Sequence, residues 1–360
     1  MYHCPMDSLF DYIKWIGPYT FKEVKPNTVD QLLLATLCYI HFESFYKEEE
    51  TLKSIAPRIL DGGFSYDKFR VEDDVRLLEG ISKANRFKNL ILTTPKANIT
   101  SIESESAKQF GAISLYDEEM LYICFRGTDA TLVGWKEDFN MSFTDAVPAD
   151  LEGLEYLEAT ADRFPDKKII VTGHSKGGHV ATYSYINARE DIKKRVLACY
   201  NNDGPGFGSE ELSRKLDEKT HTIVPESSII GMLMSYSESY KVVKSNTILI
   251  FQHNPYTWEL SGPDFAYTER TSSSIYFDKV IHSWLKEISK EHREFFVDTL
   301  FDILNTTKAT SFHGFTAKIL KNIPQITKKV NELEPEDKKM IAHILKELFK
   351  SGIGKNESDS

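Results

Sequence analysis

The sequence predicts an α/β protein whose sheet is largely parallel and covered by helices on both faces. Apolar strands and amphipathic helices alternate between residues 165 and 255, which is typical of parallel strands joined by helical crossovers. Ahead of this region, two apolar runs at residues 112–116 and 121–125 flank an acidic turn at residues 117–119 and predict a β-hairpin. We expect the hairpin, over residues 111–125, to supply the antiparallel edge of the sheet.

Helices are expected before the hairpin. Residues 7–16 and 29–46 carry apolar side chains at helical spacing, as Leu9 and Tyr12 illustrate. The stretch from residue 50 to residue 110 is predicted to be mostly helical and polar, with interruptions at proline and glycine.

Within the alternating region, the predicted elements follow one another in order. They are a helix at 150–163, a strand at 168–172, a helix at 177–189, a strand at 195–201, a helix at 209–217, a strand at 221–224, a helix at 228–236 and a strand at 247–252. From residue 275 the chain is predicted to be helical again, with two lysine-rich helices in residues 315–350. We expect one domain over residues 1–305 and a helical C-terminal extension with a frayed tail over residues 306–360.

The composition fits a globular chain of 360 residues, because 41% of the residues are hydrophobic. The formal net charge of −10 argues against nucleic acid as a partner and gives no reason to expect an anionic membrane surface. The first residues lack the basic and apolar segments of a signal peptide, and the longest apolar stretches are too short to span a bilayer. The four cysteines lie far apart, so we expect reduced cysteines and a cytoplasmic location.

No cofactor or metal is expected. His, Cys and Asp residues do not cluster at the spacing of metal ligands. The glycine-rich stretch of residues 204–208 has Pro205 where a phosphate-binding loop would need a backbone N–H.

The strongest local signal lies in residues 169–179. An apolar, β-branched run passes through the sequence Gly-His-Ser-Lys-Gly directly into a helical pattern. A strand, a sharp turn and a helix are what a nucleophile elbow requires, with Ser175 at its apex. Gly173 and Gly177 are expected where strand and helix pass too close for side chains. A plain loop serine is the alternative interpretation.

A serine hydroxyl becomes nucleophilic when a base takes its proton, and the base needs a partner that fixes its tautomer. Asp203 is the predicted acid, because it follows an apolar strand and stands beside a Gly-Pro-Gly turn. His253 is the predicted base, because it ends the strand predicted at 247–252. Both would lie at the carboxyl ends of strands, where open α/β sheets place their sites. Glu226 and Asp264 are alternative acids.

The other histidines fit the role of base less well. His174 and His179 belong to the elbow, His221 begins a strand, His282 lies inside an amphipathic helix, and His313 lies in a helical tail. Structural roles are also open for the two predicted partners: Asp203 as a turn residue with local hydrogen bonds, and His253 as a satisfied polar group.

Acyl transfer also needs donors that face the developing oxyanion. One is expected to be the backbone N–H of Lys176, the residue after the nucleophile, whose side chain is expected to be solvated. The other is expected from Thr128, which follows Gly127 in the turn after an earlier strand and offers a backbone N–H and a hydroxyl. An ordinary turn that closes the strand is the alternative.

Several motifs together resemble the class 3 lipase branch of the α/β-hydrolases. They are Phe125-Arg126-Gly127-Thr128, Trp135 with Asp138 and Phe139, and Gly173-His174-Ser175-Lys176-Gly177-Gly178. A wider set resembles an uncharacterised bacterial family of lipase-like α/β-hydrolases more closely; it comprises residues 134–141, 200–207, 222–225 and 252–255. The resemblance covers residues 5–305.

The resemblance implies an α/β-hydrolase fold, a role for Thr128 in the oxyanion hole, and a lid at residues 132–143. Packing in the core is an equally good explanation for the apolar side chains of this segment. Class 3 lipases usually carry the catalytic acid at the start of an Asp-x-Val-Pro-like segment. Thr222 stands at that position here, so the acid is expected at Asp203 instead. Their catalytic histidine usually lies beyond the segment that residues 253–258 resemble, and no Asp-His pair follows in this chain.

These observations predict a serine hydrolase that cleaves a carboxylic ester of a small molecule or lipid by an acyl-enzyme mechanism, with Ser175, His253 and Asp203 as its triad. A thioesterase or peptidase with the same site is one alternative, because a triad does not select its acyl donor. A binding protein that keeps the fold without turnover is another. The sequence gives no signal for an oligomeric state.

Overall fold

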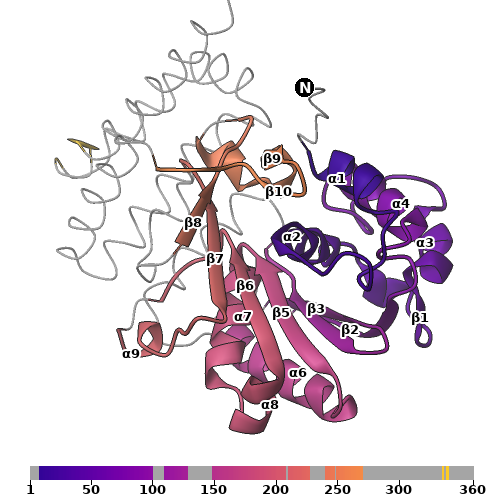
Figure 1. The fold of residues 1–360 in the computed structure, drawn as a ribbon, viewed down its shortest axis with the longest axis horizontal. Coiled ribbons are helices and arrows are strands. Elements are labelled where there is room, and N and C mark those ends of the chain that lie inside the picture. The colour runs from indigo at the N-terminus through magenta and orange to yellow at the C-terminus, as the bar shows by residue number, and fades with distance from the viewer. Residues whose placement is uncertain are drawn as a thin grey trace, which may run out of the picture.

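A nine-stranded sheet runs through the centre of the described residues (Figure 1). The computed structural model describes residues 8–99, 109–128, 148–207, 210–227, 240–247 and 249–270, with residues 335, 338 and 339. The strands lie in the order β1 (Glu50–Thr51), β2 (Ile91–Ile99), β3 (Gln109–Tyr116), β4 (Met120–Phe125), β5 (Lys168–His174), β6 (Val196–Asn202), β7 (Thr220–Pro225), β8 (Tyr240–Val243) and β11 (Tyr267–Thr268). Two short strands, β9 (Leu260–Ser261) and β10 (Asp264–Phe265), pair with each other.

The centre of the sheet is parallel, as the sequence predicts. Strands β4 to β8 run parallel to one another, whereas β1, β2, β3 and β11 are added antiparallel. Because parallel strands have their carboxyl ends at one edge, the loops after β4, β5 and β6 lie close together. The predicted hairpin is confirmed as β3 and β4. It is not the edge of the sheet, however, because β2 pairs with β3 and β1 pairs with β2.

Strand β4 shows that the sheet serves two hydrophobic cores. Leu121, Ile123 and Phe125 belong to one apolar cluster, and Tyr122 and Cys124 belong to the other. Successive side chains of a strand point to opposite faces, so an uninterrupted apolar run means that both faces are buried.

Helices cover these two faces (Figure 1). On one face lie α1 (Leu9–Trp15), α2 (Thr28–Leu37), α3 (Leu52–Leu60) and α4 (Glu72–Lys83), and on the other lie α6 (Pro148–Arg163), α7 (Lys176–Asn187) and α8 (Glu190–Arg195). We call residues 8–90 the N-terminal layer, and its helices confirm the predicted helical N-terminal segment. A parallel central sheet, helices on both faces and a sharp turn from β5 into α7 are the features of an α/β-hydrolase fold.

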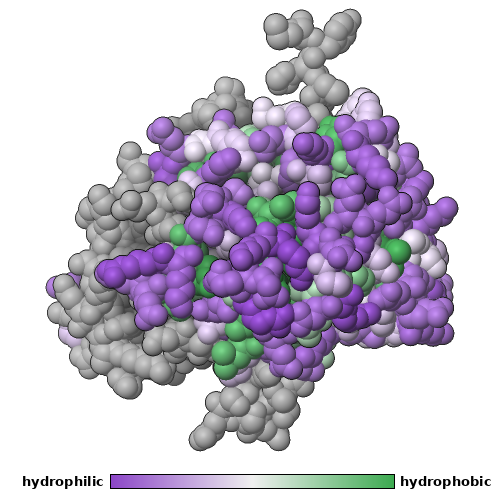
Figure 2. All heavy atoms as spheres, turned by 60° about the horizontal axis from the view of Figure 1, so that its bottom comes forward, coloured by the Kyte–Doolittle hydropathy of each residue, from purple (hydrophilic) through white to green (hydrophobic). Residues whose placement is uncertain are grey.

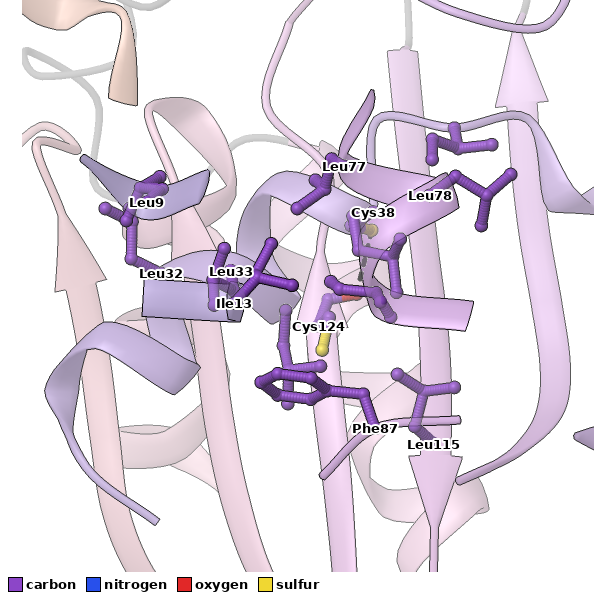
Figure 3. Packing of buried hydrophobic residues seen from close by; sticks show 14 of the residues in the cluster. Leu9, Ile13, Leu32, Leu33, Cys38, Leu77, Leu78, Phe87, Leu115 and Cys124 are labelled. Carbon is purple, nitrogen blue, oxygen red and sulfur yellow. Dashed lines mark hydrogen bonds between the residues drawn. The ribbon is translucent and has the colours of Figure 1, made fainter. Parts of the chain in front are cut away.

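Helix α2 packs against β5 and is fixed at both ends. At its start, the side chain of Asn27 accepts hydrogen bonds from the N–H groups of Val29 and Asp30, and the Asp30 carboxylate accepts from the N–H of Asn27, which completes a capping box. At its end, the thiol of Cys38 donates to the carbonyl oxygen of Cys124 in β4 at 3.2 Å (Figure 3). The helix is thereby held in one position over the sheet.

The face of the described residues drawn in Figure 2 is mainly hydrophilic. On the face drawn in Figure 2, the hydrophobic side chains form small patches among hydrophilic ones. No helix in the described ranges is both long enough and apolar enough to pass through a bilayer. Three cysteines of those ranges, Cys38, Cys124 and Cys199, are buried free thiols, as the sequence predicts.

The prediction of a mostly helical stretch at residues 50–110 is wrong in part, because the stretch contains β1 and β2 beside α3 and α4. In β2, Thr94 has a φ of 45°, Pro95 follows it, and the register with β3 shifts between Thr93 and Lys96. A bulge of this kind breaks the alternation by which a strand is recognised in a sequence.

The strand predicted at 247–252 is also wrong. The segment forms a 3₁₀ helix, η2 (Leu249–His253), and β8, which was not predicted, takes the next place in the sheet. The Gln252 side chain stabilises this turn, because it accepts from the N–H of Ser227 at 2.7 Å and donates to the carbonyl of Thr247 at 3.0 Å. A short apolar run does not distinguish a strand from a buried helical turn.

Other predicted helices are shortened or fall outside the described residues. The helix expected at 209–217 is the four-residue α9 (Glu210–Ser213). The helix expected at 228–236 and those expected beyond residue 275 lie outside the described residues, apart from residues 335, 338 and 339, which are helical. The division of the chain at residue 305 therefore stays a prediction.

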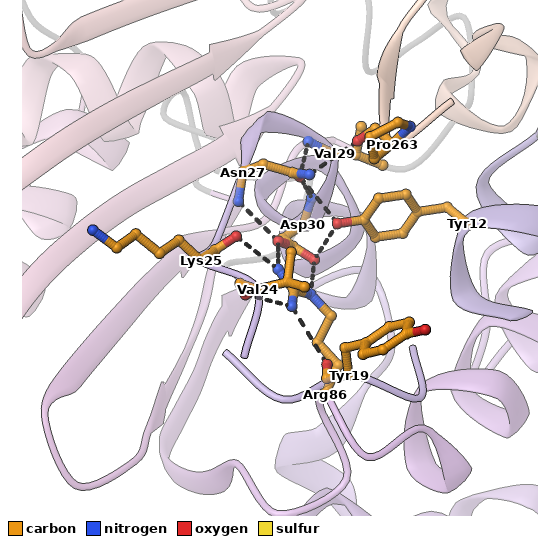
Figure 4. A network of polar contacts seen from close by, with 9 residues as sticks. All are labelled: Tyr12, Tyr19, Val24, Lys25, Asn27, Val29, Asp30, Arg86 and Pro263. Atoms are coloured by element: carbon orange, nitrogen blue, oxygen red, sulfur yellow. Dashed lines mark hydrogen bonds and ion pairs between the residues drawn. The ribbon is translucent and has the colours of Figure 1, made fainter. Parts of the chain in front are cut away.

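A buried ion pair joins parts of the N-terminal layer (Figure 4). Arg86 donates from Nε and Nη2 to the two carboxylate oxygens of Asp30 at 2.6 and 2.5 Å, and neither side chain is exposed to solvent. The Tyr12 hydroxyl donates to the same carboxylate at 3.0 Å, and Nη1 of Arg86 donates to the carbonyl of Val24 at 2.8 Å. These bonds tie α1, α2 and the segment before β2 together.

We predict that Arg86→Met lowers the free energy of unfolding by about 3–5 kcal/mol, because removal of one partner leaves a buried charge without its counter-charge. Urea denaturation measures the change. The exposed pair of Lys22 and Glu118 provides the control, and Lys22→Met should change the free energy of unfolding little. Equal effects of the two substitutions would contradict the role given to the buried pair.

Candidate active site

Ser175 lies at the sharp turn between β5 and α7. Its backbone has φ 59° and ψ −137°, a conformation that residues with side chains rarely adopt. A Cβ atom at Gly173 would lie 2.0 Å from the carbonyl oxygen of Gly177, and one at Gly177 would lie 2.1 Å from the carbonyl oxygen of Phe125. Helix α7 approaches β5 at Gly173 and the end of β4 at Gly177 this closely because both positions are glycine. The turn therefore has the shape that the sequence predicts for it.

Asp203 follows β6 in a loop that its neighbours hold in place. Its φ is 52°, and its backbone N–H donates to a carbonyl oxygen of β7 at 2.8 Å. The side-chain oxygen of Asn201 accepts from the N–H of Gly204 at 2.8 Å. The side-chain amide of Asn202 donates to the carbonyl oxygen of Gly173 at 2.9 Å, which ties the loop to the strand before the elbow.

His253 is the last residue of η2 and precedes a second 3₁₀ helix, η3 (Pro255–Thr257). The indole N–H of Trp258 donates to the carbonyl oxygen of Gln252 at 2.8 Å, so the chain folds back beside the histidine. The prediction that His253 follows a strand is wrong. A 3₁₀ turn carries it to the end of the sheet instead.

The three predicted residues Ser175, Asp203 and His253 meet in the structure. Nδ1 of His253 lies 2.6 Å from Oδ2 of Asp203, and Nε2 of His253 lies 2.8 Å from Oγ of Ser175. Each of the three residues is exposed by 4% or less. A carboxylate accepts hydrogen bonds, so a neutral His253 ring carries its proton on Nδ1 and accepts from the serine hydroxyl at Nε2. This order of bonds prepares the hydroxyl to lose its proton.

Of the two predicted oxyanion donors, Lys176 directly follows Ser175, and Thr128 lies in a turn that approaches it. Lys176 is the first residue of α7, and the first N–H groups of a helix have no partner within the helix. A Cβ atom at Gly127 would lie 3.0 Å from the Cβ of Ser175, so the turn that contains Gly127 and Thr128 approaches the serine closely. The expectation of a solvated Lys176 side chain is wrong, because the residue is 6% exposed.

The alternative candidates have other contacts. The carboxylate of Asp264, in β10, accepts from the hydroxyl of Tyr267 at 3.0 Å. Glu226 follows β7, where its backbone N–H bonds to β8. The ring of His221, in β7, lies 4.9 Å from that of Tyr200. Outside the described residues lie His282, His313 and the predicted lid at 132–143.

A second buried histidine lies behind the elbow, and its partner was not predicted. Nε2 of His179 lies 3.5 Å from Oδ2 of Asp150 in α6, and Nδ1 lies 3.2 Å from the carbonyl oxygen of Pro205. Burial opposes a charge on this ring, but the Asp150 carboxylate and the carbonyls of Pro205 and Gly206 outweigh it, so the pKa of His179 is raised. The contact links α6, α7 and the loop after Asp203.

Tyr39 is a further residue that the sequence did not indicate. Its hydroxyl lies 2.9 Å from Nδ1 of His174, the residue before Ser175. Tyr39 lies near the end of the apolar run that forms α2, and the sequence pattern alone indicates a core residue. A buried tyrosine in such a run carries no signal of a partner that lies 135 residues away.

The sequence matches the family model described as Mbeg1-like over residues 81–302. This range contains Ser175, Asp203 and His253. No curated protein matches the chain.

Several lipases are similar to the chain at a low level. A Lip2 lipase from Yarrowia lipolytica is 11% identical, with 70% of this chain and 89% of that chain covered and a TM-score of 0.38. A triacylglycerol lipase, described as having a serine protease triad at its catalytic centre, is 16% identical, with 72% and 91% covered and a TM-score of 0.39. A deletion mutant of a Rhizomucor miehei lipase propeptide complex is 15% identical, with 68% and 73% covered and a TM-score of 0.39. These likenesses are too distant to indicate a reaction.

We predict that the contact between His179 and Asp150 stabilises the fold at lower pH and loses this effect as the pH rises. The folded-state pKa of His179 is raised above an unfolded value of about 6.5. The contribution of the charged ring is therefore complete below about pH 6.5 and is lost as the pH rises through the folded-state pKa. A double-mutant cycle of His179→Gln and Asp150→Asn, measured by urea denaturation at about pH 6 and about pH 9, should give the larger coupling energy at the lower pH. An equal coupling energy at both values would rule out the charged contact.

Proposed function

The chain belongs to the Mbeg1-like family, a lipase-like family, and on that premise we propose that it is a serine hydrolase that cleaves a carboxylic ester. The observation that carries the proposal is the hydrogen-bonded series of Ser175, His253 and Asp203, with distances of 2.8 and 2.6 Å. A hydroxyl beside the accepting nitrogen of an imidazole, with a carboxylate on the other nitrogen, is the arrangement that activates a serine.

In the proposed reaction, His253 takes the hydroxyl proton as Oγ of Ser175 attacks the ester carbonyl. Asp203 holds the ring in orientation and stabilises the imidazolium that forms. The imidazolium then gives its proton to the departing alcohol, and the acyl group stays on the serine. A water molecule, deprotonated by His253, attacks this acyl-enzyme and releases the acid, which returns Ser175 to its starting state.

Two groups are proposed to bind the oxyanion of each tetrahedral intermediate. The backbone N–H of Lys176 is one, and the positive end of α7 adds to its attraction for negative charge. Thr128 is the other, through its backbone N–H and its hydroxyl. The close approach of Gly127 to Ser175 supports this assignment, because it brings the turn within reach of the reacting carbonyl.

We propose an acyl ester of a small molecule or a lipid as the substrate, and the cytoplasm as the location. The resemblance of the Gly-Thr turn and the elbow to class 3 lipases supports a lipid-like acyl group. The three buried free thiols are consistent with a reducing compartment. Hydrolysis rates on an oxygen ester, a thioester and an amide with one common acyl chain separate an esterase from a thioesterase or a peptidase. Faster hydrolysis of the thioester or the amide would replace the proposed substrate class.

A fluorophosphonate probe, which reacts with activated serines, tests the proposed nucleophile. We predict that it labels the wild type and that Ser175→Ala removes the label. Asp203→Asn should lower kcat by about 10⁴-fold, because it favours the wrong tautomer of His253. Asp264→Asn removes a carboxylate that bonds to Tyr267 and should keep the wild-type kcat.

Two results would change the proposal in different ways. If the probe labels the wild type no more strongly than Ser175→Ala, the protein is not a serine hydrolase, and a binding protein without turnover replaces the proposed function. If the probe labels the wild type and Asp203→Asn hydrolyses the ester at the full rate, the protein is a serine hydrolase whose catalytic acid is another residue.

A second prediction concerns the hydroxyl of Thr128. Thr128→Val keeps the size of the side chain and the backbone N–H but removes one proposed donor to the oxyanion. Loss of one such donor typically costs about 10²–10³ in kcat with little change in KM. Steady-state kinetics on a soluble ester measure the effect, and Thr128→Ser should retain most of the activity. Unchanged kcat in Thr128→Val would limit the role of this residue to its backbone.

A further inference from the structure

The residue before the proposed nucleophile contacts the backbone of the proposed base. Nε2 of His174 lies 2.9 Å from the carbonyl oxygen of His253. A carbonyl oxygen accepts hydrogen bonds, so Nε2 of His174 must carry the proton that is shared in this contact. The bond joins the end of β5, which is fixed in the sheet, to η2, which is a short turn of irregular backbone.

Tyr39 bonds to the other ring nitrogen of His174. Its hydroxyl lies 2.9 Å from Nδ1 of His174, and with the proton on Nε2 the neutral ring accepts at Nδ1 from the tyrosine. His174 is 1% exposed, and burial, the neighbouring His253 ring and the Arg70 guanidinium all lower its pKa well below the ordinary value. The ring is therefore neutral, and its donor and acceptor positions are fixed.

The N-terminal layer holds Tyr39 in turn. The guanidinium of Arg70 lies 3.9 Å from the centre of the Tyr39 ring, and the same guanidinium lies 3.6 Å from the carboxylate of Asp74 at the start of α4. Asp74 accepts from the hydroxyl of Tyr256 at 2.8 Å, three residues after His253. The N-terminal layer thus contacts the segment that carries the base directly at Tyr256, and it reaches His253 through Tyr39 and His174.

The ring of His253 also packs on this series of residues. The centres of the His174 and His253 rings lie 4.8 Å apart with an angle of 36° between their planes. Ring packing and the bond to the backbone carbonyl together restrict both the position and the rotation of His253. A catalytic group must be held to within about 0.5 Å of its productive position, which a short 3₁₀ turn does not ensure without such support.

We propose that His174 and Tyr39 are positioning residues, which fix the main chain and the ring of His253 so that Nε2 faces Oγ of Ser175. The proposal rests on the proposed function, since it assigns a task within that same site. It makes the N-terminal layer part of the catalytic unit, because the orienting hydroxyl comes from the segment after α2. Neither residue touches the reacting atoms, so both act through His253.

Kinetics of three variants test the proposal. Tyr39→Phe removes the hydroxyl that donates to Nδ1 of His174 and should lower kcat by about tenfold, with KM within about twofold of the wild-type value. His174→Leu removes both hydrogen bonds and should lower kcat by about 10²-fold, the effect of a small misplacement of a catalytic group. His174→Gln keeps one donor and one acceptor and should recover much of the loss.

Tyr12→Phe is the matched control. It also removes a buried tyrosine hydroxyl, one that bonds to Asp30 in the same layer. A general loss of stability would affect Tyr12→Phe and Tyr39→Phe alike, whereas positioning of the base affects the kcat of Tyr39→Phe alone. Equal kcat values in these two variants, with His174→Leu folded and fully active, would overturn the proposal.

A spectroscopic measurement keeps this test separate from that of the proposed function. The proton on Nδ1 of His253, shared with Asp203, should give a downfield proton resonance in the wild type. Tyr39→Phe and His174→Leu should shift or broaden this resonance, and Tyr12→Phe should leave it in place. A shift in a protein that no fluorophosphonate labels would mean that the positioning is present and the hydrolase function is not. If the resonance and the labelling rate are unchanged in both variants, the protein is a serine hydrolase and the proposed positioning role of Tyr39 and His174 is wrong.

Discussion

The close approach of strand β5 and helix α7 is the constraint on which the site depends. A Cβ atom at Gly173 would lie 2.0 Å from the carbonyl oxygen of Gly177, one at Gly177 would lie 2.1 Å from that of Phe125 in β4, and the chain between the two glycines turns through the unusual conformation of Ser175. Strain of this kind persists where surrounding contacts impose it. Here the two hydrophobic cores impose it, because β5 contributes to both and cannot move without disturbing either.

Parallel strands bring the remaining residues to the same place. Asp203 follows the strand next to β5, and the side chain of Asn202 binds its loop to Gly173, so the carboxylate is placed by the sheet itself. His253 is placed differently, by a short helical turn that other parts of the structure hold. One partner of the serine thus derives from regular structure. The other depends on tertiary contacts, and the N-terminal layer supplies several of them.

This difference explains how much the sequence could reveal. The elbow, the hairpin and Asp203 were predictable, because each depends on residues that are neighbours in the chain and have characteristic turn or strand patterns. The sequence predicts His253 at the end of a strand, whereas the residue ends the 3₁₀ helix η2, which brings it to the end of the sheet. Strand β2 escaped notice because its bulge interrupts the alternation. The partners Tyr39 and Asp150 could not be predicted, because they meet the elbow only after the chain has folded.

The N-terminal layer has a consequence for the chain during its synthesis. Its apolar cluster includes both Leu9 and Phe265, and the side chain of Asn27 donates to the carbonyl of Pro263, 236 residues later. Contacts between residues so distant in sequence form late, because closing the intervening loop is slow. A nascent chain leaving the ribosome therefore presents an unfinished hydrophobic face until the segment around Phe265 has emerged. A translation product that ends before this segment would keep the face exposed to aggregation and to chaperones.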